Sequence, residues 1–271
     1  MFTLILLFAM KVAIPSEMAC VGSIQDATLP LDVYVAAVEM EGTTTLAAQG
    51  QILYLNGPKA SSLKAGTIYG VVRPEGKIRN SLTGDRAGYY YQDVGKVRIV
   101  SVGSGHATAL VQDSCQGMRK GDLVVPDVPK APVEFAGEFS TDTATLPPQG
   151  VASSILVGKD DSRQLAAGSI CFIGLGSRDG VKAGDRFVVF RPYRGYKSSD
   201  MAVGKPASDA PYRPIADWGY RFSLDSLLRG RKLPPQILGD IVVVETGSRT
   251  STGKIVNSLS EIHVGDLVVK K

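Results

Sequence analysis

The chain has 271 residues, of which 44% are hydrophobic, and it carries a formal net charge of +4. This length allows one or two ordinary domains, and the apolar fraction is sufficient to bury their cores. The 30 glycines and 15 prolines are typical of short strands joined by many turns, and they exclude a protein built of long helices. So small a positive excess gives no ground for a nucleic-acid partner, and we expect none.

The first residues have the pattern of a secretory signal peptide. Residues 2–10 (FTLILLFAM) are almost entirely apolar, but the run is far shorter than the ~20 residues of a membrane-spanning helix. Pro15 and the small Ala19 follow at a plausible cleavage distance. The basic residue that normally precedes such a run is absent and Lys11 follows it, as expected if the true start codon lies upstream. We predict a signal peptide over residues 1–19 and an exported bacterial protein, periplasmic or associated with the outer membrane; the alternative is a buried first strand.

The three cysteines leave alternatives open. Cys20 stands where a lipoprotein cysteine would stand, although of the preceding Glu17-Met18-Ala19 only the alanine fits the usual pattern. A contact with the membrane is expected only if Cys20 is lipidated. Cys115 and Cys171 either pair with each other in an oxidising compartment or are small core residues.

The chain repeats itself in two gap-free blocks. Residues 50–74 align with residues 168–192 at an offset of 118, and both contain a Lys-Ala-Gly turn and end in Arg-Pro. Residues 94–125 align with residues 238–269 at an offset of 144, and both end in Gly-Asp-Leu-Val-Val. The change of offset places 26 extra residues between the blocks of the second copy. The repeat predicts an internal duplication.

The duplication defines the expected domain organisation. A first module occupies residues 20–125, and a second occupies residues 150–271 with an insertion at 193–237. The joining residues 126–149 contain five prolines and several Ser and Thr residues, a composition typical of an exposed linker.

Within each module, short apolar and β-branched runs alternate with glycine turns. The strands expected in the first module are 36–38, 52–55, 67–73 (stopped by Pro74), 97–102, 107–112 and a closing Leu-Val-Val piece. Those expected in the second are 155–157, 170–173, 186–191, 241–246, 251–256 and the same closing piece. Five or six short strands at this spacing predict an all-β fold of two tandem small β-barrel or SH3-like modules, closed or half-closed, with little helix. One short helix is expected, at Ser223–Arg229.

The turn GSRDGVKAGDRFVVFRP (176–192), followed by LGDIVVVETGSRTSTGKIVNSLSEIHVGDLVV (238–269), resembles the C-terminal domain of the bacterial flagellar T-ring-associated outer-membrane proteins. Similar modules occur in exported proteins that carry peptidoglycan-binding LysM repeats, although no such repeat is visible here. The resemblance covers the second module well and the first more loosely. It implies a periplasmic, non-catalytic assembly or scaffold module.

The sequence offers no pattern of catalytic or metal-binding residues, so we expect neither an enzyme nor a cofactor nor a metal. His106 and His263 are not shared between the two copies and are interpreted as polar residues on a strand or turn. A cysteine hydrolase that pairs His106 with Cys115 is the less favoured alternative, because Cys115 aligns with Leu259 and is expected to face inward. No phosphate-binding loop or zinc motif is present. Asp122 and Asp266, in the repeated Gly-Asp-Leu-Val-Val, are expected to accept hydrogen bonds from nearby backbone N–H groups.

The insertion is the one candidate recognition surface. Residues 193–235 contain eight Lys or Arg against four Asp, and six of the nineteen aromatic residues of the chain. Basic and aromatic residues on a long loop are favoured at interfaces, but the same aromatics could cap the barrel, and Tyr89–Tyr91 stand at the matching place in the first module. The candidate binding residues are Tyr193, Arg194, Tyr196, Tyr212, Arg213, Trp218, Tyr220 and Arg221.

These observations favour a non-catalytic exported cell-envelope protein, a scaffold or assembly module that binds other envelope proteins or itself. The alternative from another class is a peptidoglycan- or glycan-binding protein that stacks sugars on Tyr212, Trp218 and Tyr220.

Overall fold

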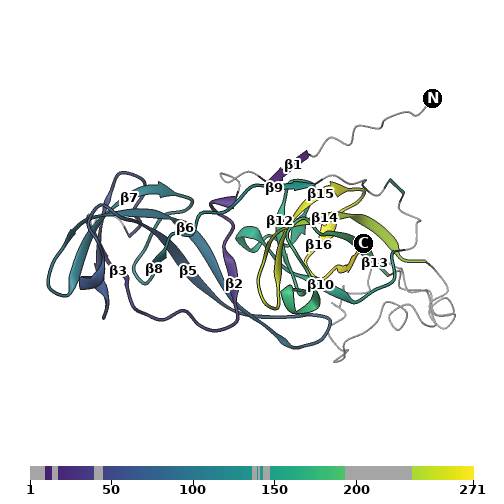
Figure 1. Ribbon diagram of the computed structural model, residues 1–271, viewed down its shortest axis with the longest axis horizontal. Coiled ribbons are helices and arrows are strands. Elements are labelled where there is room, and N and C mark those ends of the chain that lie inside the picture. Colours follow the sequence, from purple (N-terminus) through teal and green to yellow (C-terminus); the bar gives the residue numbers. More distant parts are fainter. Residues whose placement is uncertain are drawn as a thin grey trace, which may run out of the picture. The chain divides into compact units, whose positions relative to one another are not determined.

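A computed structural model describes residues 10–13, 18–39, 45–135, 139, 141–142, 147–192 and 234–271. These residues form β-strands joined by turns and short 3-10 helices, so the all-β prediction is confirmed (Figure 1). They belong to two compact units. The first-barrel unit comprises Ala13–Lys77 and Gly88–Pro132, and the second-barrel unit comprises the residues before Ala13, the segment Ile78–Ala87 and the residues from Val133 onward.

The first-barrel unit contains a closed six-stranded antiparallel barrel. Its strands follow the order β6-β5-β8-β3-β4-β7, and β7 pairs with β6 to close the barrel. A short further strand, β2 (Ser23–Gln25), pairs with Tyr89–Tyr91 of β6. The barrel strands are β3 (Tyr34–Val38), β4 (Ile52–Asn56), β5 (Ile68–Arg79), β6 (Arg86–Val102), β7 (His106–Ser114) and β8 (Leu123–Pro126).

The second-barrel unit contains a closed barrel of the same topology, with the order β10-β12-β15-β14-β13-β17. In the order just given, these strands are the repeat equivalents of β3, β4, β7, β6, β5 and β8. The strand order around the closed barrel is therefore the same in both copies. The two modules are therefore copies of one small β-barrel. The strands are β10 (Ala152–Gly158), β12 (Ile170–Ile173), β13 (Arg186–Arg191), β14 (Gln236–Thr246), β15 (Ser251–Ser258) and β17 (Leu267–Lys270), with β11 (Gln164–Leu165) and β16 (Ile262–His263) paired beside them.

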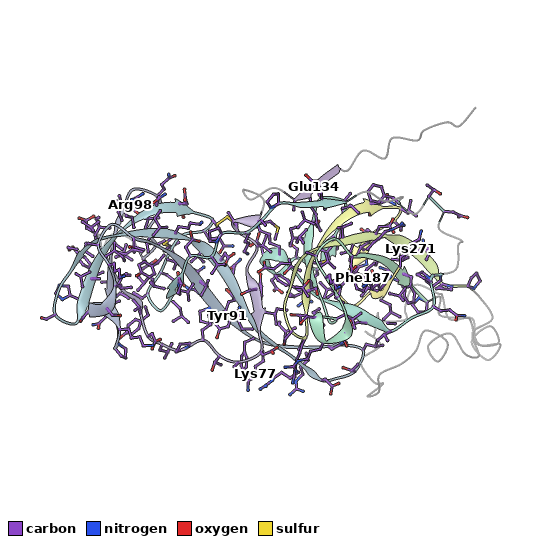
Figure 2. The ribbon with its side chains drawn as sticks, viewed as in Figure 1. Lys77, Tyr91, Arg98, Glu134, Phe187 and Lys271 are labelled. Carbon is purple, nitrogen blue, oxygen red and sulfur yellow. A yellow bond between two sulfur atoms is a disulfide. The ribbon has the colours of Figure 1, made fainter. Side chains whose placement is uncertain are left out.

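Side chains of each barrel alternate between an inner core and a smaller outer cluster, as expected for strands. On β13, Phe187 and Val189 pack in the inner core, whereas Val188 and Phe190 pack in the outer cluster. Figure 2 labels Phe187 within the second barrel, where its side chain is fully buried. Both faces of this strand are thus covered by apolar contacts.

The hairpin of β5 and β6 is longer than the sequence pattern indicates. Pro74 was expected to end the first of these strands, but β5 continues to Arg79 and β6 already begins at Arg86. The pairing of β5 with β8 ends at Val72. Pro74 lies beyond it, so the missing N–H group of the proline costs this ladder no hydrogen bond. Pro192 agrees with the prediction, since β13 ends at Arg191.

The repeated glycine turns adopt the predicted backbone conformation. Gly66 and Gly184, the last residues of the two Lys-Ala-Gly turns, have φ angles of +81° and +87°. These angles lie in the left-handed region that favours glycine. The helix predicted at Ser223–Arg229 lies outside the described residues.

The chain segments before and after the first barrel pair with each other. Strand β1 (Met10–Ala13) pairs with β9 (Val133–Phe135) in a two-stranded sheet, and Val12 and Ala13 are buried. Part of the expected linker 126–149 is therefore a strand. Residues 1–9, which carry most of the apolar run, lie outside the described residues, so the signal peptide stays a prediction.

Candidate functional site

The eight predicted binding residues all lie outside the described residues, because the description stops at Pro192 and resumes at Pro234. Their role at an interface therefore stays a prediction. The residues on either side do fix where the insertion leaves the barrel. It connects β13 to β14, the same connection that joins β5 to β6 in the first copy.

The aromatic run of the first copy has a packing role. Tyr89–Tyr91 lie in strand β6, and Tyr90 and Tyr91 are each 3% exposed. Tyr91, labelled in Figure 2, belongs to an outer cluster with Val72 and Leu123. Of the two interpretations left open for this run, the described structure supports packing over an exposed surface.

The cysteines pair in a way that the sequence analysis did not consider. A disulfide joins Cys20 to Cys115 in the first-barrel unit (Figure 2), and Cys171 is a free, buried thiol in the second barrel. The predicted alternative in which Cys115 pairs with Cys171 is therefore wrong. The other predicted alternative, that these cysteines are small core residues, is confirmed for Cys171 alone. Lipid attachment at Cys20 is also contradicted, because one sulfur cannot form both a disulfide and a thioether. Burial raises the pKa of the Cys171 thiol to about 12.

The geometry contradicts a catalytic pair of His106 and Cys115. Strand β7 (His106–Ser114) separates the two residues, and nine residues at ~3.3 Å each place them about 30 Å apart. Cys115 is half-buried in its disulfide and does not face inward into the core as expected. A sulfur held in a disulfide cannot supply the thiolate that such an enzyme requires.

Each barrel contains an Arg–Asp pair at the same position of the repeat. Nε and Nη2 of Arg73 each donate to Asp122 over 2.8 Å. In the second barrel, Nε and Nη2 of Arg191 each donate to Asp266 over 2.7 Å. Both carboxylates are 1% exposed, so each pair holds one strand, β5 at Arg73 or β13 at its last residue Arg191, against the turn before the closing strand.

The predicted role of the two aspartates in their turns is confirmed. The backbone N of Arg119 donates to Asp122 over 2.8 Å, and that of His263 donates to Asp266 over 2.6 Å. The arginine partner is the addition that the sequence analysis missed. A signal was present, because the Arg-Pro that ends the first block is repeated as faithfully as the Gly-Asp-Leu-Val-Val that ends the second.

His263 lies on β16, as predicted, and contacts the second of these pairs. Nη2 of Arg191 lies 2.7 Å from Nδ1 of His263, and His263 is half-buried. His106 is exposed at the start of β7. Neither residue belongs to a group of three or more His, Cys, Asp or Glu side chains able to hold a metal within the described ranges.

The outer apolar cluster of the second barrel is capped by the hairpin tip. Leu82, in the connection between β5 and β6, is 1% exposed and packs with Phe190, Ile237 and Leu267. The segment Ile78–Ala87 that carries it belongs to the second-barrel unit. The first copy thus sends its β5–β6 connection to cover apolar residues outside its own barrel.

The corresponding cluster of the first barrel is covered by a different segment. Its buried members Val72 and Leu123 are the repeat equivalents of Phe190 and Leu267. Leu29 packs against it, and the backbone N of Leu29 donates to the hydroxyl of Tyr91 over 2.8 Å. The outer face of each barrel is therefore a patch that a separate piece of chain covers.

A hollow of about 390 Å³ lies in the second-barrel unit beside the hairpin tip. Its lining includes buried polar side chains that are hydrogen-bonded to one another. Nδ2 of Asn80 donates to Oγ of Ser153 over 3.1 Å, and Oδ1 of Asn80 accepts from Oγ of Ser154 over 3.1 Å. A Cβ at Gly174 would lie 2.6 Å from both Asn80 Nδ2 and Ser153 Oγ, so this network leaves room only for glycine there.

Three arginines from three separate segments also line the hollow. They are Arg86 at the start of β6, Arg178 in the 3-10 helix η3 (Ser177–Asp179) and Arg249 in the turn between β14 and β15. Asp85 and Asp179 line it as well, so the ionised side chains carry a net charge of +1.

No helix in the part of the chain that the structure describes is long and apolar enough to cross a membrane. Comparisons of the sequence with protein-family models and with curated proteins find no match. The resemblance to the flagellar assembly module therefore stays an expectation from the repeated motifs.

Proposed function

We propose that the chain is a non-catalytic, exported cell-envelope protein that acts as a scaffold or assembly module and binds other envelope proteins or itself. The observation that carries the proposal is that the β5–β6 connection packs on a barrel other than its own. In the first copy this connection places Leu82 in an apolar cluster outside its own barrel. In the second copy the same connection is the basic and aromatic insertion.

Position and composition together favour a partner for the insertion. The module uses this connection once, within the chain, to cover the outer face of a barrel. The second copy has lengthened it and enriched it in Arg, Tyr and Trp, the residue types that contribute most at protein interfaces. We infer that the insertion covers a corresponding apolar face on a partner, either another envelope protein or a second copy of this chain.

The disulfide supports the export part of the proposal. Disulfides persist in oxidising compartments such as the periplasm and are rare in the reducing cytosol. Cys20 directly follows the expected cleavage position, so a chain that began at this residue would retain the bond to Cys115.

The test is a pull-down from envelope extract with the disulfide-bonded chain. One variant replaces residues 194–234 with a short Gly/Ser linker. A second replaces Tyr212, Trp218 and Tyr220 with Ser, and a third replaces Arg194, Arg213 and Arg221 with Gln. A matched control replaces Arg98, an exposed arginine of the first barrel, with Gln. Specific capture that the linker variant loses and the Arg98→Gln control retains would support the proposal.

The outcomes separate the two classes of function. Capture of proteins that is unchanged by the linker would contradict the insertion as the interface. The glycan-binding alternative predicts a different result, in which purified peptidoglycan sediments the intact chain and no protein is captured. If only the aromatic variant then loses co-sedimentation with peptidoglycan, the glycan-binding function replaces the scaffold function.

A further inference from the structure

The hollow beside the hairpin tip has the features of a small-molecule site rather than of a gap between loops. Its volume of about 390 Å³ lies within the ~300–1,000 Å³ range of ligand pockets, near the small end. It is too small for a folded partner. This feature is independent of the insertion, on which the proposed function rests.

The walls of the hollow are fixed by backbone hydrogen bonds. The backbone N of Ser177 donates to the carbonyl of Gly247 over 2.9 Å, and that of Arg178 donates to the carbonyl of Ser248 over 3.1 Å. The two loops that carry Arg178 and Arg249 are thus joined to each other. On the third side, the backbone N of Gly84 donates to the carbonyl of Asn80 over 2.8 Å and closes the hairpin tip.

The charges of the hollow favour an anion. Guanidinium groups are ionised at any working pH and present paired N–H donors that match the oxygens of a carboxylate or phosphate. Of the two acidic residues, Asp179 already accepts from the backbone N of Gly176 over 3.0 Å through Oδ2. Asp85 is exposed, as are the three arginines, so water screens the charges of both signs and the net charge of +1 remains.

The neutral part of the lining favours a ligand with a compact body. Asn80 and Ser153 are 8% and 2% exposed and form a buried polar surface, and Leu175 and Ala152 supply apolar contact. Val151 also belongs to the lining and is 57% exposed. We propose that the hollow binds a small organic oxyanion, a carboxylate or phosphate ester of roughly sugar size, through Arg178, Arg249 and Arg86.

The test uses the full disulfide-bonded chain labelled with ¹⁵N. Citrate, glucose 6-phosphate and, as a neutral control, glucose are titrated at constant ionic strength while backbone amide shifts are followed. Saturable shifts that centre on residues 80–87, 174–180 and 247–250 are expected with at least one of the two anions and not with glucose. A preference for citrate or for the phosphate ester identifies which oxyanion the site takes.

Two variants separate a site from general attraction of anions to a basic surface. Replacement of both Arg178 and Arg249 by Gln removes two charged donors and is expected to weaken binding about tenfold or more. Arg98→Gln removes an arginine of the first barrel that is also exposed, and it is expected to leave the affinity unchanged. An absence of saturable shifts in the three segments, or equal affinity in these two variants, would overturn the proposal. Neither readout depends on the insertion, so the outcome is independent of the pull-down.

Discussion

Replacing the buried aspartate in one barrel should cost more stability than the same change in the other. In the first barrel, Asp122 accepts two hydrogen bonds from Arg73 and one from the backbone N of Arg119, all at 2.8 Å. The side chains of Arg73 and Asp122 are 9% and 1% exposed. Asp122→Asn therefore leaves a buried guanidinium without its counter-charge, which costs about 3–5 kcal/mol.

The second barrel provides the internal comparison. Asp266 is as buried as Asp122, but the side chain of its partner Arg191 is 32% exposed. Water can solvate that guanidinium after the change, so Asp266→Asn is expected to cost about 1–3 kcal/mol. Asp113→Asn, at an exposed position of β7, should lie within about 0.5 kcal/mol of the unmodified chain.

Urea unfolding gives the free energies, and hydrogen exchange read by mass spectrometry assigns each loss to one barrel. The pair Arg73→Met and Asp122→Leu completes a double-mutant cycle. Because the double variant buries no unpaired charge, it should recover part of the loss, with a coupling of about 0.5–3 kcal/mol. Additivity of the two single changes, or equal costs for Asp122→Asn and Asp266→Asn, would refute the explanation by burial.

Three further predictions concern the disulfide, the hairpin tip and the buried thiol. Replacing both Cys20 and Cys115 with Ser should lower the free energy of unfolding of the first barrel by about 2–4 kcal/mol, measured in urea beside the oxidised chain. Leu82→Ala should destabilise the second-barrel unit by about 2–5 kcal/mol and speed hydrogen exchange in β13 and β17, whereas the same loss located in the first barrel would contradict the capping role. Cys171 should resist a thiol reagent at pH 8 until the chain unfolds, because burial raises its pKa from 9.0 to about 12. The stability linked to its protonated form is present below pH 9 and is lost as the pH rises toward 12, so Cys171→Ala should remove that part of the pH dependence of unfolding.

The barrels could be predicted because their signals are local and occur twice. The Lys-Ala-Gly turns fix φ angles that favour glycine, as seen at Gly66 and Gly184, and the strands between them alternate inner and outer apolar residues. Because the same turns and strands recur in both copies, the pattern could be distinguished from a chance match. The length of β5 could not be predicted in this way, since whether Pro74 ends a strand depends on where its neighbour β8 stops pairing.

The contacts that concern function are distant in sequence and carry weaker signals. The number of cysteines allows several pairings, and the residues of the bond between Cys20 and Cys115 are 95 positions apart. Leu82 is a single apolar residue in a polar turn, and nothing near it indicates that it packs on a barrel formed by residues 150–271. The hollow gathers Arg86, Arg178 and Arg249 from segments that only the folded chain brings together.

The disulfide also gives the chain a closed covalent ring. The hairpin tip, including the exposed Gly84, Asp85 and Arg86, lies between Cys20 and Cys115 and so within that ring. A protease that cut the tip once would produce two fragments still joined through sulfur, with Cys20 on one fragment and Cys115 on the other. A nicked molecule would therefore migrate as an intact chain until it was reduced, and in an oxidising compartment a cut at this exposed tip would release neither barrel.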